Sequence, residues 1–312
     1  MKVVIETLTS AAEVRDDSYD IDTFLLSHPQ GIYTVCRTLH KHSIVDYDSH
    51  IARLEKSLRG KGTWNDDTMT SHDLEVDARE HIIHALKLAE PLFSSNDASA
   101  AATLEFRCCV LSTDVIPSKD NNPSKFSFAI MIEPLPIVSE KSVAIEIWRA
   151  KRDTPGVKDS VWVQKRKFMK DRTHSEPRVN EVVIESIEDS DSLLEGLSSN
   201  FFAVTKSGEV VTAPEGTVLI GTIRIMVEEA CKKLGIPVKY ECPRESDMEN
   251  WSGAFVTSTT RMVLEVDEVR FIDEKAMIPR KECVNFKVPC DVIQRIADHV
   301  KSQLESASTK LF

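Results

Sequence analysis

Apolar residues recur along the chain at two spacings, and each spacing predicts a different kind of element. Ile51, Leu54 and Leu58 follow one another at three and four residues, the spacing of a helix with one buried face. Residues 31–40 are instead rich in β-branched and aromatic side chains, which is typical of a strand. The same reasoning predicts helices at 46–58, 75–92, 161–172, 221–234 and 291–304. It predicts strands at 31–40, 102–112, 125–134, 142–150, 181–187, 201–205, 209–212, 255–260 and 262–271.

Turn-forming residues mark where several of these elements end. Residues 114–125 are rich in proline, asparagine and serine, so the strands on either side are expected to form a hairpin with a long tip. Lys206-Ser207-Gly208 predicts a second, tighter hairpin. Gly235 is a candidate C-cap, and Ser49 could cap the helix at 46–58. The residues after Leu304 read as a polar tail.

The order of the elements predicts the fold class and the domains. Helices and strands are intermixed without regular alternation, which favours an α+β fold over a doubly wound parallel sheet. A chain of 312 residues is long enough for about two domains. The two prolines in 133–136 break any strand there, so this is the candidate linker. We expect an N-terminal domain at 1–134, a linker at 135–141 and a C-terminal domain at 142–312.

Charge and composition exclude several classes of protein. Lys and Arg number 39 and Asp and Glu number 50, and the resulting net charge of −11 disfavours a general nucleic-acid binder. No apolar run reaches the roughly 18 residues of a membrane span, and the N-terminus lacks the pattern of a targeting peptide. The seven cysteines include no CxxC pair, which is typical of thiols in a reducing compartment. We therefore expect a cytoplasmic protein with no membrane, nucleic-acid or metal partner.

Two segments could bind an anion such as a phosphate. Leu219–Arg224 opens a predicted helix, where free backbone N–H groups attract anions, although it is equally an ordinary helix start capped by Thr222. Arg53 lies on an earlier helix beside Ile51. Its planar guanidinium suits phosphate oxygens, and the alternative is a solvated arginine on an amphipathic helix.

Two further segments could carry a reaction. In Glu195–Phe202, an acid, a glycine and small polar residues precede a strand. This is either a loop bonded to its own backbone or a carboxylate that faces a cationic ring nitrogen. Lys158 follows a Pro-Gly turn among apolar residues. It is either a surface charge or a partly desolvated lysine whose lowered pKa makes it a better nucleophile.

In chain order these segments read H-x-x-R-L, a lysine, E-G-x-S-S-N-x-F and L-x-G-x-x-R. The series resembles the fold-type IV, pyridoxal-phosphate-dependent family (aminotransferase class IV), which includes branched-chain aminotransferases, D-amino acid aminotransferases and aminodeoxychorismate lyases. The resemblance runs from about Gly31 to Val266. It implies a two-domain α+β fold like that of D-amino acid aminotransferase, with pyridoxal 5'-phosphate as cofactor. It also implies a homodimer, with each site between the two domains of one subunit.

The resemblance implies a role for each matching residue. Lys158 would link covalently to the cofactor and later move a proton between the substrate Cα and the cofactor. Glu195 would keep the pyridine nitrogen protonated. Arg53 and the backbone N–H groups of Thr222 and Ile223 would bind the phosphate. The other implied cofactor contacts are Ser199, Asn200, Gly221 and Thr259, and the implied substrate contacts are Arg107, Thr260 and Tyr33.

The sequence departs from the family pattern in three places. The hydroxyl in Gly221–Arg224 stands one position early, and residues 159–162 lack the tyrosine that branched-chain members carry after the lysine. Glu105 replaces a tyrosine that branched-chain members place two residues before the strand arginine. We expect a retained cofactor site and a substrate site of no familiar subclass. An aminotransferase acting on an amino acid, branched-chain or otherwise, and a 2-oxo acid is the leading hypothesis; an aminodeoxychorismate lyase and a non-catalytic cofactor-binding homologue are the alternatives.

Overall fold

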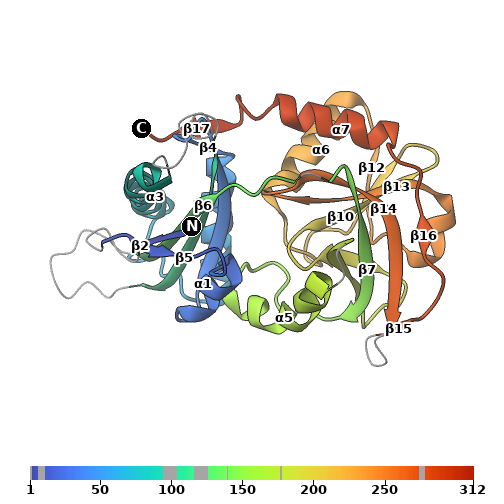
Figure 1. Ribbon diagram of the computed structural model, residues 1–312, viewed down its shortest axis with the longest axis horizontal. Helices are drawn as coiled ribbons and strands as arrows, with labels where there is room; N and C mark the ends of the chain where they lie inside the picture. The colour runs from blue at the N-terminus through green and yellow to red at the C-terminus, as the bar shows by residue number, and fades with distance from the viewer. Residues whose placement is uncertain are drawn as a thin grey trace. The chain divides into compact units, whose positions relative to one another are not determined.

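The computed structural model describes residues 2–5, 11–93, 104–115, 126–138, 140–175, 178–273 and 278–312 (Figure 1). The chain divides into two compact units. The first unit comprises Met1–Ile137, Val157–Gln164 and Leu304–Phe312, and the second comprises Val138–Gly156 and Lys165–Gln303. Among the described residues, no helix is long and apolar enough to cross a membrane.

The first unit is built on a 7-stranded sheet in the order β17-β4-β3-β5-β6-β1-β2. All of its pairings are antiparallel, and β5 and β6 form the predicted hairpin, whose tip lies outside the described residues. The elements are β1 (Lys2–Ile5), β2 (Glu13–Arg15), α1 (Ile21–Ser27), β3 (Ile32–Leu39), β4 (Ser43–Val45), α2 (Tyr47–Lys61), α3 (Ser71–Phe93), β5 (Phe106–Val115), β6 (Phe126–Pro134) and β17 (Ser308–Lys310).

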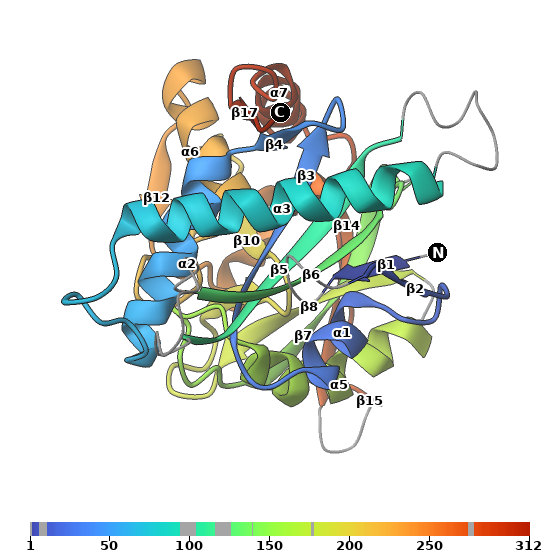
Figure 2. The ribbon, with the colours of Figure 1, turned by 90° about the vertical axis from the view of Figure 1, so that its left-hand side faces the viewer.

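The two faces of this sheet bury different side chains. On one face, Leu54 and Leu58 of α2 and Ile82 of α3 belong to one apolar cluster with Ile32 and Ile130 of the sheet. Helices α2 and α3 lie over this face (Figure 2). On the other face, a smaller apolar cluster joins α1, β3, β5, β6 and the start of α5 (Ser160–Ser175). Residues of a strand alternate between faces, so β3 contributes to both clusters.

The second unit is built on a 10-stranded sheet in the order β12-β11-β10-β13-β14-β7-β8-β9, with β15 and β16 paired to β14. Because β9 also pairs with β10, the strands from β10 round to β9 close into a barrel. Its core contains Phe201, Trp251 and Phe271. The elements are β7 (Ser142–Ala150), β8 (Val179–Ser186), β9 (Leu193–Gly196), β10 (Asn200–Thr205), β11 (Val210–Thr212), α6 (Thr222–Leu234), β12 (Val238–Tyr240), a 3₁₀ turn (Glu245–Asn250), β13 (Trp251–Ser258), β14 (Met262–Asp273), β15 (Ile278–Pro279), β16 (Val284–Asn285) and α7 (Asp291–Ser302).

Most predicted elements are confirmed, and the errors lie at their ends and in short elements, which include the unpredicted helix α1 and several strands. Asp46, in a left-handed conformation, precedes α2, so the predicted cap at Ser49 is wrong. Gly221, not Thr222, is the N-cap residue of α6, while Gly235 is the predicted C-cap, with a φ of 66°. The predicted polar tail contains β17, which pairs with β4.

The two compact units do not follow the chain in order, because distant segments pair with the first unit. Tyr33 N–H donates to Lys158 O at 3.0 Å, and Ile32 forms a bridge with Asp159. Strand β17 brings residues from the C-terminus to the edge of the same sheet. The predicted boundaries at 1–134, 135–141 and 142–312 stay a prediction.

Candidate functional site

Lys158 is held in the first unit by its own backbone. Its N–H donates to Ser57 Oγ at 3.1 Å, and its carbonyl accepts from Tyr33 N–H at 3.0 Å. The side chain is half-buried, and Nζ lies 4.8 Å from the centroid of the Tyr33 ring. A cation above an aromatic face is attracted by the ring's quadrupole. The lysine backbone is therefore anchored by α2 and β3, and its ammonium lies against a side chain that was predicted to contact substrate.

Arg53 of α2 belongs to a polar cluster in the same unit. Its Nη2 donates to Thr34 Oγ1 at 2.6 Å and to His50 Nδ1 at 3.1 Å. Burial lowers the pKa of Arg53 to about 10, which still leaves it charged at neutral pH. Its Nε is buried and has no hydrogen-bond partner in the described part of the chain. The hydrogen bonds of Nη2 thus fix the orientation of the guanidinium, while the Nε–H donor stays unpaired within the described part of the chain.

His50 is a residue of this cluster to which the sequence analysis assigned no role. Its side chain is buried, and Nδ1 also lies 2.8 Å from Thr34 Oγ1. Burial, followed by the charges of Arg53 and Lys158, holds the pKa of His50 well below its usual value. The imidazole is therefore neutral and accepts a hydrogen bond from Arg53. The H-x-x-R spacing was the available signal, since residues three apart share a helix face.

A pair of arginines lies farther along β3 and β5. Arg37 and Arg107 are directly opposite in the register, and Tyr33 and Arg37 share a face because even spacing along a strand returns to the same side. Arg107 Nε donates to Glu133 Oε1 at 2.7 Å. Burial lowers the pKa of Arg37, and its buried Nε has no hydrogen-bond partner among the described residues. The sheet face that bears Lys158 therefore has two cationic side chains at its far end.

In the second unit, Glu195 is buried in β9 and paired. Its Oε1 accepts from Arg152 Nη1 at 2.8 Å, and its Oε2 accepts from Leu219 N–H at 3.1 Å. The side chains of Arg152 and Glu195 are 7% and 5% exposed, respectively. Glu195 stands in a predicted motif, whereas Arg152 has no signal in the sequence other than its charge.

Asn200 joins the two motifs of this unit. Its Nδ2 donates to Leu219 O at 2.7 Å, and its Oδ1 accepts from Gly221 N–H at 3.0 Å. Only glycine fits at position 221, because a Cβ there would lie 2.4 Å from Asn200 Oδ1. The segment before α6 is thus fixed against the start of β10.

The N-terminus of α6 presents backbone donors. The N–H groups of Thr222 and Ile223 have no recorded acceptor within the described ranges, as expected for the first turn of a helix. Thr257 lies opposite Asn200 in the register, so both side chains lie on one face of the sheet. The buried Thr257 hydroxyl has no hydrogen-bond partner in the described part of the chain. Arg224 ties the helix down through its Nη1, which donates to Ala213 O at 2.8 Å.

Ser199 is engaged with a buried acid. Its hydroxyl donates to Glu181 Oε2 at 2.8 Å, and that oxygen also accepts from Arg261 Nη1 at 3.1 Å. Arg261 stands at the turn between β13 and β14 that contains Thr259 and Thr260. The buried Glu181 of β8 thus connects the turn that contains Thr259 and Thr260, through Arg261, with the turn before β10, through Ser199.

The structure groups the predicted residues within each unit. Lys158, Arg53 and Tyr33 lie together in the first unit, with Arg107 on the same sheet. The predicted residues of the second unit are Glu195, Ser199, Asn200, Gly221, Thr222, Ile223, Thr259 and Thr260. Their assigned roles stay predictions. Among the residues that the structure describes, no cluster of His, Cys, Asp and Glu side chains could hold a metal ion.

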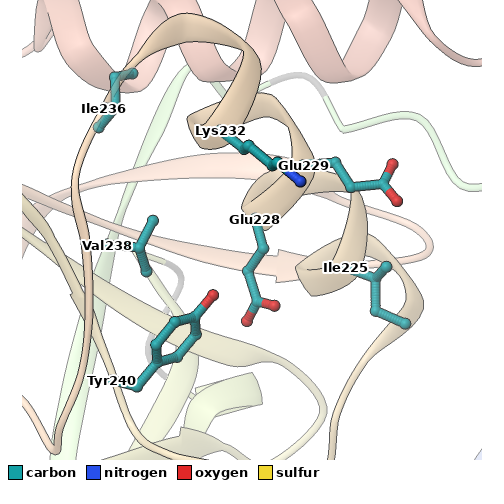
Figure 3. Close-up of a pocket in the computed structure, with 7 residues that line it drawn as sticks. All are labelled: Ile225, Glu228, Glu229, Lys232, Ile236, Val238 and Tyr240. Atoms are coloured by element: carbon teal, nitrogen blue, oxygen red, sulfur yellow. The ribbon is translucent and has the colours of Figure 1, made fainter.

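One surface hollow lies apart from these residues. It has a volume of about 360 Å³ and lies between α6 and β12, with Tyr240 and Glu228 on facing sides (Figure 3). No predicted site residue lines it.

Comparison with known proteins gives one family match and several structural matches. The family model described as amino-transferase class IV matches residues 31–269. No curated protein sequence matches the chain. The fold is similar to a branched-chain aminotransferase from Thermoproteus uzoniensis solved with norvaline, at 14% identity and a TM-score of 0.70, with 99% of each chain covered.

Two other solved structures are similar. An aminotransferase from Brucella abortus bound to the cofactor PLP has 18% identity and a TM-score of 0.63, covering 97% of this chain and 99% of that one. A putative 4-amino-4-deoxychorismate lyase from Legionella pneumophila has 13% identity and a TM-score of 0.63, covering 92% and 96%. At these identities the likeness concerns the fold, and it confirms the predicted α+β class.

Proposed function

Because the chain belongs to the amino-transferase class IV family, we propose that it is a pyridoxal 5'-phosphate-dependent aminotransferase that transfers an amino group between an amino acid and a 2-oxo acid. The family match confirms the predicted resemblance. The observation that carries the proposal is Lys158, anchored through its backbone and set against Tyr33 in the unit that also holds the part-buried Arg53. A lysine and an oriented arginine are the groups that an aldehyde and a phosphate require.

The residues present suit this cofactor. Arg53 Nε is a buried donor with no hydrogen-bond partner in the described ranges, and the Thr257 hydroxyl is another such group in the second unit. The first turn of α6 adds the N–H groups of Thr222 and Ile223, and helix N-termini favour phosphate. Glu195 is a buried carboxylate that accepts from Arg152 Nη1 and from Leu219 N–H. The donor set therefore matches a phosphate and a basic ring nitrogen.

Each side chain has a proposed task. Lys158 would supply the amine for the covalent link and would move a proton at the substrate Cα. Arg53, oriented by His50, would bind phosphate. The N-terminus of α6 would supply further donors to a phosphate. Glu195 would hold a proton at the ring nitrogen. The cofactor supplies an electron sink for the bond that breaks at Cα.

The remaining predicted residues receive narrower roles. Asn200 and Gly221 shape the segment before α6, and Ser199 acts through Glu181 to support the turn after β9. Thr259 is proposed near the phosphate. Thr260 is proposed to contact a substrate carboxylate.

The arginines on the face that bears Lys158 favour an anionic substrate group. Arg107 and Tyr33 are the proposed substrate contacts, and Arg37 adds a second cation whose buried Nε has no hydrogen-bond partner among the described residues. On this face the apolar side chain of Val35 lies between Tyr33 and Arg37. Both a branched-chain side chain and a second carboxylate would find a partner on this face.

An absorption spectrum of the purified protein tests the proposal. We expect a visible band from bound cofactor that bleaches with some amino acids and returns with a 2-oxo acid. Lys158→Ala should fold, because the backbone contacts to Ser57 and Tyr33 remain, but should show neither the band nor amino transfer. Unaltered amino transfer in Lys158→Ala would overturn the proposal.

A lyase acting on aminodeoxychorismate is the second candidate. It is supported by the similarity to the Legionella structure. The absence of a tyrosine in 159–162 instead motivates the third candidate, a non-catalytic homologue. Product analysis separates the two, since the lyase releases pyruvate and an aminotransferase does not consume aminodeoxychorismate. A protein that binds the cofactor but gives no half-reaction with any amino acid of either enantiomer would be the non-catalytic homologue.

We further propose a cytoplasmic homodimer. The family resemblance supports the dimer. The seven cysteines are all free thiols, and five of them are buried, which suits a reducing compartment. Light scattering on the purified protein measures the oligomeric state.

A further inference from the structure

Arg152 and Glu195 form an ion pair shielded from solvent. The two side chains are 7% and 5% exposed, and the atoms Nη1 and Oε1 lie 2.8 Å apart. The other carboxylate oxygen, Oε2, accepts from Leu219 N–H. Each oxygen of Glu195 therefore has at least one partner from its own unit. A carboxylate can accept about four hydrogen bonds, so pairing with one cation does not prevent it from accepting from another.

The ion pair with Arg152 weakens the attraction of Glu195 for a second cation. A guanidinium at this distance offsets much of the charge of the carboxylate, and the effect is strong because water is excluded. A second cationic group that approaches the same carboxylate is attracted by the acid and repelled by the arginine. Glu195 thus binds such a group less strongly than an unpaired carboxylate would.

We infer that Arg152 is a positioning residue that shares Glu195 with the ring nitrogen of the cofactor and thereby weakens the hold of Glu195 on the ring proton. The inference rests on the proposed function, since it needs a ring nitrogen at Glu195. Arg152 also stands in the loop that leads from β7 to Lys158, so a purely structural role for the pair in this loop is the competing explanation.

The two explanations differ in what happens when the arginine is removed. If Arg152 shares Glu195, its loss leaves a buried carboxylate without a counter-ion in the cofactor-free protein, and the ring nitrogen then supplies the missing positive charge. If Arg152 only braces the loop, its loss weakens the cofactor-free and cofactor-bound proteins equally.

The experiment compares thermal unfolding of Arg152→Met and the unaltered protein, each alone, with pyridoxal 5'-phosphate, and with the 1-deaza analogue in which carbon replaces the ring nitrogen. A ligand raises Tm according to its affinity for the folded state. We expect Arg152→Met alone to melt several degrees lower. Pyridoxal 5'-phosphate should raise the Tm of Arg152→Met by more than it raises the Tm of the unaltered protein. The analogue should raise the Tm of Arg152→Met by no more than that of the unaltered protein.

Two variants make the result specific. Arg152→Lys retains the charge and should give a cofactor-induced Tm rise close to that of the unaltered protein. Arg149→Met removes an arginine that is 48% exposed and paired with Glu185, and should leave the cofactor-induced rise unchanged.

Should Arg152→Met fail to fold, the ¹⁵N shift of ring-labelled cofactor in Arg152→Lys and Arg152→Gln tests the same point. Greater protonation of the ring in Arg152→Gln is the expected result.

Equal cofactor-induced rises in Arg152→Met and the unaltered protein would overturn the inference and leave the proposed function standing. So would an extra rise that the deaza analogue reproduces, or a ring ¹⁵N shift that is the same in all variants. If neither compound changes the Tm of the unaltered protein, the proposed function itself fails, and the inference fails with it.

Discussion

The side-chain amide of Asn200 clasps the backbone at Gly221: the Gly221 N–H donates to Asn200 Oδ1 at 3.0 Å, and Asn200 Nδ2 donates to Leu219 O at 2.7 Å. Since Oε2 of Glu195 also accepts from Leu219 N–H, two residues of the E-G-x-S-S-N motif bind the L-x-G segment. The two motifs therefore act as one structural piece, and the glycine is needed for the close approach.

Gly221→Ala should disrupt this clasp. The added Cβ would lie 2.4 Å from Asn200 Oδ1, so the amide must move and two buried hydrogen bonds weaken. We expect a loss of about 1–3 kcal/mol in the free energy of unfolding, measured with urea. Gly156→Ala is the control, because its Cβ would meet no atom within 4 Å. Equal stability of the two variants would show that the clasp does not hold the segment.

Arg261→Ala should destabilise the second unit more than removal of an exposed arginine. Arg261 pairs with Glu181, whose side chain is 4% exposed, and donates to Asn180 O at 3.0 Å. Breaking a buried pair costs about 3–5 kcal/mol, and we expect about 2–4 because Ser198 and Ser199 still donate to Glu181.

Arg178→Ala is the matched control for Arg261. Its side chain is 58% exposed and pairs with Asp267, so we expect a change of at most about 1 kcal/mol. Chemical denaturation of both variants makes the comparison. If Arg261→Ala loses no more unfolding free energy than Arg178→Ala, the predicted stabilisation by the Arg261–Glu181 pair is contradicted.

Stability should fall in mild acid because of His50. Its pKa is lowered in the folded protein, so below the ordinary value of 6.5 the unfolded chain binds a proton that the folded chain excludes. Stability is then lost as the pH falls through 6.5, by up to about 1.4 kcal/mol per pH unit. In His50→Gln this part of the slope should disappear. The pKa of His81 is lowered too, so the test is the difference between the variant and the unaltered protein, and identical slopes would refute it.

Glu265 should make stability depend on pH in the direction opposite to that of His50. Burial raises its pKa above 4.5, although it accepts from Cys290 N–H at 2.5 Å and from Gln294 Nε2 at 3.2 Å. The folded protein therefore binds the extra proton, and stability declines as the pH rises from 4.5 through the raised pKa. Glu265→Gln should flatten that decline. Urea unfolding at several pH values between 4 and 7 measures it, and a decline as steep in the variant as in the unaltered protein counts against the assignment.

The long elements could be predicted because their burial is periodic. Helix α6 was expected at 221–234 and runs from Thr222 to Leu234, and the strand expected at 142–150 is β7. Short strands escaped prediction. Strand β17 consists of Ser308–Lys310, which show no apolar alternation, and it forms because the edge of β4 offers backbone partners.

The residues with proposed roles in the reaction stand in sequence motifs, whereas the residues that form ion pairs around the site do not. Lys158, Arg53 and Glu195 stand in recognisable patterns. Arg152 and Arg261 stand in none, and each is paired with a buried acid brought to it by the barrel. A charged residue looks solvated in sequence, and only burial reveals that it must have a partner.

The sequence by itself determined where the longer helices and strands form, that the fold is α+β and which family the chain belongs to, since these depend on local periodicity and on motifs with set spacing. Tertiary structure alone decided that Arg152 pairs with Glu195, that Asn200 binds the backbone of Gly221 and that the last strand joins the first sheet. Those contacts link residues that are far apart in the chain. They arise because buried backbone groups and buried charges must be paired, and the packing of the folded chain determines which partners lie within reach.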